Sequence, residues 1–534
     1  MGTTEPTLMS TRDAAQFLGW SEEYVRRLAR DKRIPAVKVG RRQWRFWQHE
    51  LQEWITCGCP SRSEGTSPIV DTAESGWSIS ERAVRYRLSP VGHGTQARLP
   101  LNGANQMFSA PAFSENSEEP FHRWVNWIAG FSASFVRECI GEFMPTGRGL
   151  IVDPFAGVAT SLLEAMVAGH HAVGFEINPF AALVGRTKLA AFGMEADAIQ
   201  DLALRFERWM RDALKANTPP RALPPAGFRS RIPFFSPAIA NQVLLVMDFM
   251  GELTDSCSSD LMKIALGSTM VSFSNYTYEP SLGTRPGAGK PLIADADVCG
   301  VIAAKLSQMA SDVRRLGSSR RKAGGQGVIH PESFFGCLET GKLAPSSVDL
   351  LITSPPYPNN YHYVRNTRPH LYWLGLVRSQ GQLLDLELQS YGRFWQTVRT
   401  SRPIGLAFEL PEAASLVDRI RGQNHERGPY GGPGWANYVA CYLNDSWRFV
   451  SLIHALLKPG RTAAVVVGNH IIQGVNFEVD KMLATMGERF GLVSRIHLLR
   501  DKRVGNSITN SSVRRGAAAV SIYESAVEMT KSSS

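Results

Sequence analysis

The feature that most constrains this fold is a pair of apolar runs separated by one turn and one helical stretch, in residues 149–176. Gly149 to Val152 predicts a buried strand, because a short apolar run bounded by turn residues is typical of a parallel sheet. Residues 153–160 then predict a turn into a helix over 161–168, which ends at Gly169. A strand that leads directly into a helix is the beginning of a parallel α/β unit.

The second strand of this unit, Ala172 to Phe175, ends at an acid, Glu176. This arrangement is the general plan for binding a ribose-bearing cofactor, because the carboxylate can accept hydrogen bonds from ribose hydroxyls at the switch point of the sheet. The turn after the first strand is poor in glycine and does not match the dinucleotide fingerprint, which argues against NAD. We therefore expect an α/β, Rossmann-like sheet that binds another ribose-bearing cofactor.

A second motif follows the apolar run Val348 to Ile352, which also predicts a strand: Thr353-Ser354-Pro355-Pro356-Tyr357. The two prolines fix φ, remove two backbone donors and favour an extended conformation at Ser354, so the segment should leave the strand as a rigid ledge of carbonyls. A proline-stiffened loop in which Tyr357 is a packing residue is the alternative interpretation.

The ledge fits the chemistry of an exocyclic amino group. Such an amine is a poor nucleophile because its lone pair is conjugated into the ring. Ser354 and the carbonyl of Pro355 can accept its two N–H bonds and orient the lone pair toward a methyl donor, while Tyr357 stacks on the ring. This is catalysis by positioning and directed dipoles, and it needs no strong base beforehand.

Both motifs together resemble the amino-methylating DNA methyltransferases, over roughly residues 118–525. Asp153-Pro154-Phe155-Ala156-Gly157 is similar to their S-adenosylmethionine loop, and Thr353 to Tyr357 is similar to their catalytic motif. The resemblance implies a class I methyltransferase sheet and S-adenosyl-L-methionine as cofactor. Ser-Pro-Pro-Tyr is more typical of cytosine-N4 enzymes, whereas Asp or Asn in first position is more typical of adenine-N6 enzymes.

The same resemblance implies a set of site residues. An element running from Phe121 to Ser132 resembles the one that contacts the methionine end of the cofactor, and Glu332-Ser333 takes the place of a polar contact to adenine. The implied catalytic residues are Ser354, Pro355, Pro356 and Tyr357; the implied cofactor-binding residues are Phe131, Ser132, Asp153, Pro154, Phe155, Ala156, Gly157, Glu176, Ile177, Asn178, Glu332 and Ser333.

Two differences from the motifs of DNA methyltransferases bear on activity. Ala159 stands where the family usually has a second glycine, and its Cβ is expected to crowd the cofactor and weaken binding at most. The chain has no Pro-Cys pair, which argues against cytosine-C5 chemistry because that reaction needs a thiolate.

The amino terminus carries a separate, basic module. Residues 11–18 and 22–30 predict two helices, residues 34–46 predict a two-stranded wing, and a helix follows over 49–55; the pattern resembles the helix-turn-helix module of excisionases. Residues 26–45 hold nine Lys or Arg and one acid, while the whole chain has a net charge of +10. That concentration indicates duplex DNA binding, with a protein-binding winged helix as the alternative. The candidate DNA-binding residues here are Arg26, Arg27, Arg30, Lys38, Arg41, Arg42 and Arg45.

The chain between the two motifs is far longer than a compact core requires, so we expect an insertion. Residues 195–217 and 236–272 have helical spacing, and the aromatic tract 274–280 is expected to be a loop. Target recognition is assigned either to this insertion or to the segment after the catalytic motif, where Arg365 and Arg368 are candidate DNA contacts and 428–434 is expected to be a flexible loop. We favour the later segment.

These patterns predict seven consecutive parts. They are a winged helix-turn-helix domain (1–56), a flexible linker (57–118), the cofactor-binding core (119–200), a mainly helical insertion (201–325), the catalytic strand and motif (326–364), the candidate recognition region (365–445) and the C-terminal core (446–534), which closes with a hairpin strand over 517–523.

Composition is consistent with this organisation. The 534 residues are 43% hydrophobic, enough for a large core and a small domain. The seven cysteines have no metal-ligand spacing, so we expect no metal site and free thiols in a reducing cytoplasm. No secretory signal or membrane-spanning stretch is evident, and no membrane partner is expected.

The sequence therefore predicts a site-specific DNA methyltransferase that modifies an exocyclic amino group, with cytosine N4 favoured. Its expected partner is double-stranded DNA, and a cognate restriction endonuclease or phage-defence proteins are plausible associates by resemblance. The alternatives are an adenine-N6 enzyme, an RNA base methyltransferase and, from another class, a DNA-binding regulator with an inactive methyltransferase body.

Overall fold

A computed structural model of the chain forms two compact units, residues 1–95 and 96–534, and each is described by itself. The residues that the structure describes are 8–18, 34–39, 43–48, 113–127, 130–278, 281–502 and 522–533, with the single positions 22, 25, 26, 29, 50, 51 and 108.

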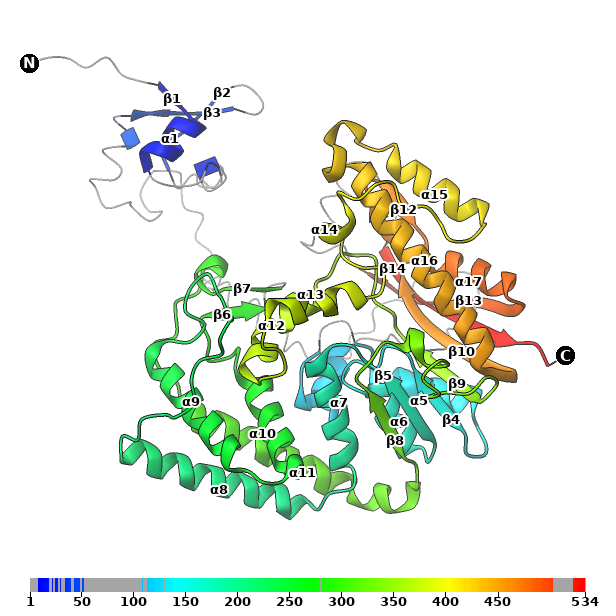
Figure 1. The fold of residues 1–534 in the computed structure, drawn as a ribbon, viewed down its shortest axis with the longest axis horizontal. Coiled ribbons are helices and arrows are strands. Elements are labelled where there is room, and N and C mark those ends of the chain that lie inside the picture. The colour runs from blue at the N-terminus through cyan, green and yellow to red at the C-terminus, as the bar shows by residue number, and fades with distance from the viewer. Residues whose placement is uncertain are drawn as a thin grey trace, which may run out of the picture. The chain divides into compact units, whose positions relative to one another are not determined.

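The N-terminal unit contains a small antiparallel sheet in the order β1-β3-β2, formed by Leu8–Ser10, Gln43–Trp47 and Val37–Val39 (Figure 1). Helix α1 (Thr11–Leu18) begins where the Ser10 backbone N–H donates to Asp13, at 3.0 Å. The predicted first helix and two-stranded wing are present, and β1 is a third strand that was not predicted. Much of the predicted helix 22–30 and the end of helix 49–55 lie outside the described residues.

The second unit is built on a seven-stranded sheet in the order β13-β14-β10-β9-β4-β5-β8 (Figure 1). Only β14 runs antiparallel to its neighbours. Because β4 pairs with both β5 and β9, the switch point of the sheet lies between β4 and β9, where α/β proteins bind ligands. The strands are β4 (Leu150–Asp153), β5 (His171–Phe175), β8 (Gly327–His330), β9 (Val348–Thr353), β10 (Leu457–Gly468), β13 (Leu492–Lys502) and β14 (Ile522–Lys531).

Helices cover both faces of this sheet, so the central strands are buried on both sides. Leu350 and Ile352 of β9 face one apolar core, and Val348 and Leu351 face the other. The first core includes α5 (Ala133–Phe143), α6 (Thr160–Val167) and α7 (Pro179–Ala191); the second includes α15 (Pro411–Arg421), α16 (Gly432–Leu456) and α17 (Val479–Arg489). The predicted α/β sheet and its first strand-helix-strand unit are confirmed.

A helical layer extends the first core, as Figure 1 shows. It consists of α8 (Ala196–Lys215), α9 (Pro237–Glu252), α10 (Ser256–Thr269) and α11 (Val298–Ala323). The predicted helices in 195–217 and 236–272 are therefore present. The proposed boundary between residues 200 and 201 falls inside α8, so this helix joins the core and the insertion.

The aromatic tract 274–280 is not simply a loop. Tyr276–Tyr278 and Leu282–Thr284 form the hairpin β6–β7. Its Tyr278 hydroxyl donates to the Asn366 carbonyl at 2.8 Å, and the Asn366 side chain accepts from the Leu282 backbone N–H. Asn366 belongs to α12 (Tyr363–Trp373), so the hairpin packs against the helix that follows the catalytic motif.

The glycine-rich stretch 428–434 also differs from the predicted flexible loop. It spans the end of the 3-10 helix η5 (His425–Tyr430) and the first turn of α16. A Cβ on Gly431 would lie 2.0 Å from the Asn424 carbonyl, and one on Gly434 would lie 2.0 Å from the Pro429 carbonyl. These glycines therefore permit close backbone packing. The boundary proposed at residue 445 falls inside α16, and the buried residues of this helix belong to the second core.

Three further segments refine the expected organisation. Phe108 and Asn116, inside the interval predicted as linker, are buried; the Asn116 side chain donates to the Phe131 carbonyl at 3.1 Å. The closing strand β14 extends to Lys531, well beyond the predicted 517–523, while 503–521 lie outside the described residues. The remaining elements are α13 (Gln380–Gln389), α14 (Trp395–Val398), β11 (His470–Ile472), β12 (Val475–Phe477), η1 (Phe113–Ser117), η2 (His122–Trp124), η3 (Pro286–Ala288) and η4 (Phe334–Gly336).

Among the helices that the structure describes, none combines the length and apolarity needed to cross a membrane.

Candidate active site

One cavity opens at the carboxyl ends of β4, β5, β8 and β9. It lies at the switch point, where α/β proteins bind their ligands. Both predicted motifs contribute to its wall. The predicted site residues that line it are Pro154, Phe155, Gly157, Glu176, Ile177, Asn178, Glu332, Ser333, Ser354, Pro356 and Tyr357.

The cofactor loop, residues 153–159, follows β4 and is held from within its own strand-helix-strand unit. Gly157 has φ +50°, and a Cβ added there would lie 3.2 Å from the Trp127 indole nitrogen. The loop therefore needs glycine at this position both for its backbone conformation and for space beside Trp127. Trp127 itself lines the cavity.

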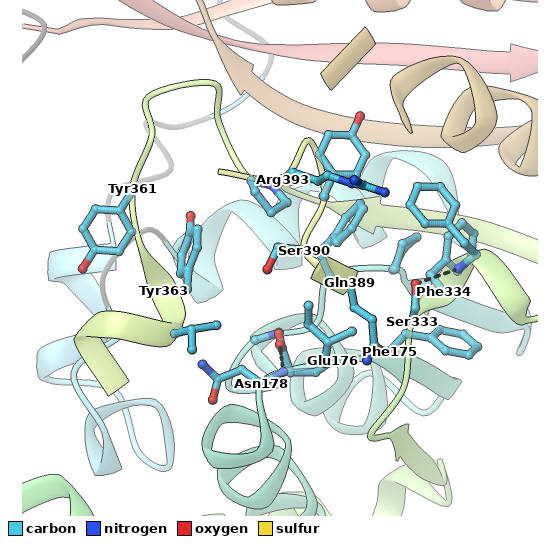
Figure 2. A pocket seen from close by; sticks show the side chains of 18 of the residues that line it. Phe175, Glu176, Asn178, Ser333, Phe334, Tyr361, Tyr363, Gln389, Ser390 and Arg393 are labelled. Atoms are coloured by element: carbon cyan, nitrogen blue, oxygen red, sulfur yellow. Dashed lines mark hydrogen bonds between the residues drawn. The ribbon is translucent and has the colours of Figure 1, made fainter. Parts of the chain in front are cut away.

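Glu176 holds the loop through both of its carboxylate oxygens. One accepts the Gly157 backbone N–H at 3.0 Å and the other accepts the Asn178 backbone N–H at 2.7 Å, the latter drawn in Figure 2. Burial raises the pKa of Glu176 to about 7, and these two hydrogen bonds act in the opposite direction. Each oxygen retains acceptor capacity toward the cavity.

Asp153 lies behind the cavity and joins its two halves. Its carboxylate accepts from the Thr353 hydroxyl at 2.6 Å, the Ser161 hydroxyl at 2.5 Å and the Phe155 backbone N–H at 3.0 Å. Thr353 is the last residue of β9, so one side chain fixes the cofactor loop relative to the catalytic motif. Burial raises the pKa of Asp153 to about 6.

A buried lysine supports the same loop from α7. Lys188 is fully buried and its Nζ donates to the Val158 carbonyl at 3.0 Å. Burial lowers its pKa to about 7. The sequence did not distinguish this residue, because a lysine in a helix is usually exposed.

The predicted catalytic ledge, Ser354 to Tyr357, is held by the half of the sheet that contains β10 and β14. The Ser354 hydroxyl donates to the Val466 carbonyl at 3.1 Å, which leaves its oxygen as an acceptor. The Tyr357 hydroxyl donates to Glu524 at 3.3 Å, and its ring meets His470 edge-on with a centroid distance of 5.6 Å. Within the ledge, Pro355 is buried and does not line the cavity, whereas Pro356 does.

Several cavity residues were not predicted. In Figure 2, Gln389 and Ser390, at the end of α13, lie opposite Glu176 and Asn178. They come from the segment that covers the strand ends, and no local pattern distinguishes them. Tyr361 and Tyr363 could have been predicted as lining residues, because they are aromatic and follow Tyr357 at short spacing. The unpredicted lining residues include Trp127, Tyr361, Tyr363, Gln389, Ser390, Tyr391, Arg393, Phe394 and Tyr438.

Other predicted cofactor contacts lie elsewhere. Ser132 caps α5 through the Phe135 backbone N–H, and the Phe131 carbonyl is bonded to Asn116, so both residues serve the local fold. Ala156 is buried in the core. Neither these residues nor Asp153 lines the cavity.

Ala159 was expected to crowd the cofactor, but its side chain does not line the cavity. Its backbone is left-handed, with φ +65°, and its fully buried side chain points toward α7. A Cβ built on Gly185 would lie 3.1 Å from the Ala159 Cβ. The glycine of α7 therefore provides the space that Ala159 occupies.

A second hollow adjoins the cavity and contains both candidate DNA contacts of the later segment. Arg365 and Arg368 line it, and Val364 lines both hollows. The Arg368 guanidinium donates to the Arg229 carbonyl at 2.9 Å, so the insertion and the later segment meet here. Arg365, Arg229 and Arg231 are exposed.

Of the candidate DNA contacts in the N-terminal unit, Arg26 and Arg45 are described. Arg26 is paired with Glu22 at 2.5 Å, and Arg45 donates to the Trp44 carbonyl at 3.5 Å. The side chains of Arg27, Arg30, Lys38, Arg41 and Arg42 lie outside the described residues.

Comparison with known proteins identifies both units. A helix-turn-helix domain family matches residues 8–56. The type II methyltransferase M.BsoBI from Geobacillus stearothermophilus is 30% identical over 74% of this chain and 83% of its own length. The type II methyltransferase M.AvaI from a Nostoc strain is 21% identical over 74% of this chain and 84% of its own.

A solved structure, the rRNA methyltransferase aviRa from Streptomyces viridochromogenes, matches with 8% identity and a TM-score of 0.23, over 76% of this chain and 88% of that one. So low a score carries no argument. By its similarity to M.BsoBI, the chain belongs to the family of type II DNA methyltransferases.

Proposed function

We propose that this protein transfers a methyl group from S-adenosyl-L-methionine to an exocyclic amino group in duplex DNA, with cytosine N4 as the favoured target. The observation that carries this proposal is that the cofactor loop and the catalytic ledge line one cavity, although they are far apart in sequence. Asp153 joins them through the Thr353 hydroxyl.

The chemistry of the cavity lining fits the proposed cofactor. Glu176 offers acceptor capacity to ribose hydroxyls, and Gly157 allows the loop backbone to approach a ligand closely. Glu332 and Ser333 line the cavity beyond β8, where a polar contact to adenine is proposed. When bound, S-adenosyl-L-methionine would supply an electrophilic methyl group.

The ledge would position the amine. The hydrogen of the Ser354 hydroxyl is donated to Val466, so its oxygen is available to accept an N–H bond from the base. We assign the second N–H bond to the Pro355 carbonyl and stacking on the base to Tyr357. Both acceptors localise the nitrogen lone pair, which makes the amine a better nucleophile without prior deprotonation.

The preference for cytosine N4 rests on Ser354. Adenine-N6 enzymes more often carry Asp or Asn at the corresponding position, so adenine N6 is the second candidate. Methylation of genomic DNA in an expressing cell, followed by mass spectrometry of its nucleosides, distinguishes N4-methylcytosine from N6-methyladenine. Long-read sequencing of the same DNA would reveal the recognised sequence, and Ser354→Ala is the matched control.

A base inside a duplex cannot reach this cavity, so the target must be flipped out, which costs about a few kcal/mol. We assign contacts with the DNA phosphates beside the flipped base to Arg365 and Arg368, because the hollow that they line adjoins the cavity. Arg365→Ala should weaken DNA binding and lower the salt dependence by about one counterion. Arg208→Ala, an exposed arginine of α8 that lines neither hollow, is the control.

The N-terminal helix-turn-helix domain supports DNA over RNA as substrate. Transfer assays with duplex DNA and structured RNA in parallel test this choice, and incorporation into RNA alone would overturn it. The alternative of an inactive body loses its only sequence argument, because the Ala159 side chain points away from the cavity.

We also propose a role in restriction-modification or phage defence, and a cytoplasmic location. The similarity to two type II methyltransferases supports the first. Protection of the expressing cell's DNA from a nuclease that cuts the recognised sequence only when it is unmethylated would test it.

A further inference from the structure

The aromatic residue of the ledge is linked to an ion pair on the two C-terminal strands. The Tyr357 hydroxyl lies 3.3 Å from one Glu524 oxygen, and the Arg500 Nε donates to the other at 2.6 Å. Only 5% of Glu524 is exposed. Neither Glu524 nor Arg500 lines the cavity, so neither is explained by contact with a ligand.

The register of the sheet brings these groups together. Glu524 of β14 is the direct partner of Gly468 in β10 on one side and of Arg500 in β13 on the other. A Cβ on Gly468 would lie 3.6 Å from the Tyr357 ring and 3.5 Å from the Glu524 side chain. The Tyr357 ring and the Glu524 side chain therefore pack beside the same strand position, and the cross-strand row ends at the phenol.

We propose that Glu524 and Arg500 are positioning residues that hold the Tyr357 ring in the orientation required to stack on the target base. This inference rests on the proposed function and adds to it the part that the antiparallel strand pair plays at the site. Arg500 pairs with the Glu524 carboxylate, which then fixes the hydroxyl of Tyr357 through a charge-assisted hydrogen bond.

The charge arrangement agrees with this role. Burial, and next the charge of Glu524, raise the pKa of the Tyr357 phenol well above its ordinary value, while the Ser354 hydroxyl acts in the opposite direction. The phenol therefore remains a donor to Glu524 at every working pH. The hydrogen bond to Glu524 anchors the far end of the ring. Without this anchor, a small rotation of the ring would move its stacking face away from the base.

A double-mutant cycle tests the proposal in the full chain. Initial rates are measured with S-adenosylmethionine carrying a labelled methyl group and genomic DNA from a host without DNA methylation. Glu524→Gln and Tyr357→Phe should each lower kcat about 10-fold with the KM for S-adenosylmethionine unchanged. The double variant should lose no more than either single variant, because both remove the same contact.

Glu528→Gln is the matched control. Glu528 lies on the same strand and forms a comparable pair with His497 at 2.7 Å, so its loss perturbs β14 without touching Tyr357. It should retain wild-type kcat. Arg500→Lys serves as a second test if Glu524→Gln does not fold, since lysine keeps the charge but not the directed Nε–H; a several-fold loss of kcat is expected.

Wild-type kcat in Glu524→Gln, or losses that multiply in the double variant, would overturn the inference while leaving the proposed function intact. If the wild-type protein itself transfers no methyl group to DNA, the proposed function fails instead. An equal loss in Glu528→Gln would mean that Glu524 only stabilises the strand.

Discussion

The cofactor loop and the catalytic ledge are both strand-end turns at one switch point, yet they are held in different ways. The loop is fixed by residues of its own strand-helix-strand unit and the next helix: Glu176 binds the Gly157 N–H, and Lys188 binds the Val158 carbonyl. The ledge is fixed by residues more than a hundred positions away, Val466 and Glu524. One turn is built locally and the other depends on the completed sheet.

This difference also divides the electrostatics of the site. The supports of the loop are a carboxylate in the cavity wall and a fully buried amine, and burial moves the pKa of each toward neutrality, to about 7 for both Glu176 and Lys188. The ledge is supported by a carbonyl and by a compensated ion pair. Loop function should therefore depend on pH near neutrality, whereas ledge function should depend on geometry.

The largest expected effect tests the ledge. Ser354→Ala removes the hydroxyl acceptor for the amine, and kcat should fall about 100- to 1,000-fold, as for other preorganised polar groups. Affinity for S-adenosylmethionine should change little, because the loop is supported separately. Single-turnover methyl transfer and calorimetric titration of the cofactor measure the two quantities. Equal losses in both would mean that the two turns are not independent.

The next effect tests the loop. Glu176→Gln replaces one acceptor oxygen with a donor that faces a backbone N–H, Gly157 or Asn178. Cofactor affinity should fall about 10- to 100-fold, the range for hydrogen bonds to a charged group. In the wild type, affinity should improve as pH rises through about 7, since the ionised carboxylate is the better acceptor. Titrations from pH 6 to 8.5 should show no such trend in Glu176→Gln.

The same contrast explains what the sequence could predict. The strand-helix-strand unit and the placement of Glu176 were predictable, because neighbouring residues carry the apolar pattern, the turn and the acid. The strand before Ser354 was predictable for the same reason. Its hydrogen-bond partners were not, since the pairing of β14 with β10 is a long-range property that leaves no local pattern.

The misassigned segments have related physical causes. The stretch 428–434 was interpreted as flexible, but Gly431, Gly432 and Gly434 closely approach carbonyls that only the folded chain brings near. Tyr276 and Tyr278 were expected in a loop, and the short hairpin that contains them is stabilised by docking on α12. Gln389 and Ser390 reach the cavity only because α13 covers the strand ends.

A smaller effect concerns stability and pH. The pKa of Lys188 is lowered in the folded state, so the unfolded chain binds more protons between about pH 7 and 10.5, and stability should rise with pH across that window. From pH 8 to 9 the wild type should gain about 1 kcal/mol relative to Lys188→Met, which has no such group. Urea unfolding at both pH values measures this, with Lys215→Met, an exposed lysine of α8, as control. A parallel response of wild type and Lys188→Met would show that the buried amine keeps its ordinary pKa.

The smallest expected effect concerns Ala159, the residue that first suggested a weakened loop. Relief of its left-handed strain, by about 1–2 kcal/mol, favours glycine, while the greater chain entropy of glycine and the loss of one buried methyl together offset a similar amount. Ala159→Gly should therefore leave the free energy of unfolding nearly unchanged. Cofactor affinity should also stay within about two-fold, because the side chain points to Gly185 and away from the cavity.

Gly185→Ala supplies the contrast: its new Cβ would lie 2.8 Å from Ile329 and 3.1 Å from Ala159, so it should push the loop and weaken binding where Ala159→Gly does not. Tighter binding in Ala159→Gly would show instead that the alanine does crowd the cofactor, and that the loop is less completely fixed by its local supports than its hydrogen bonds indicate.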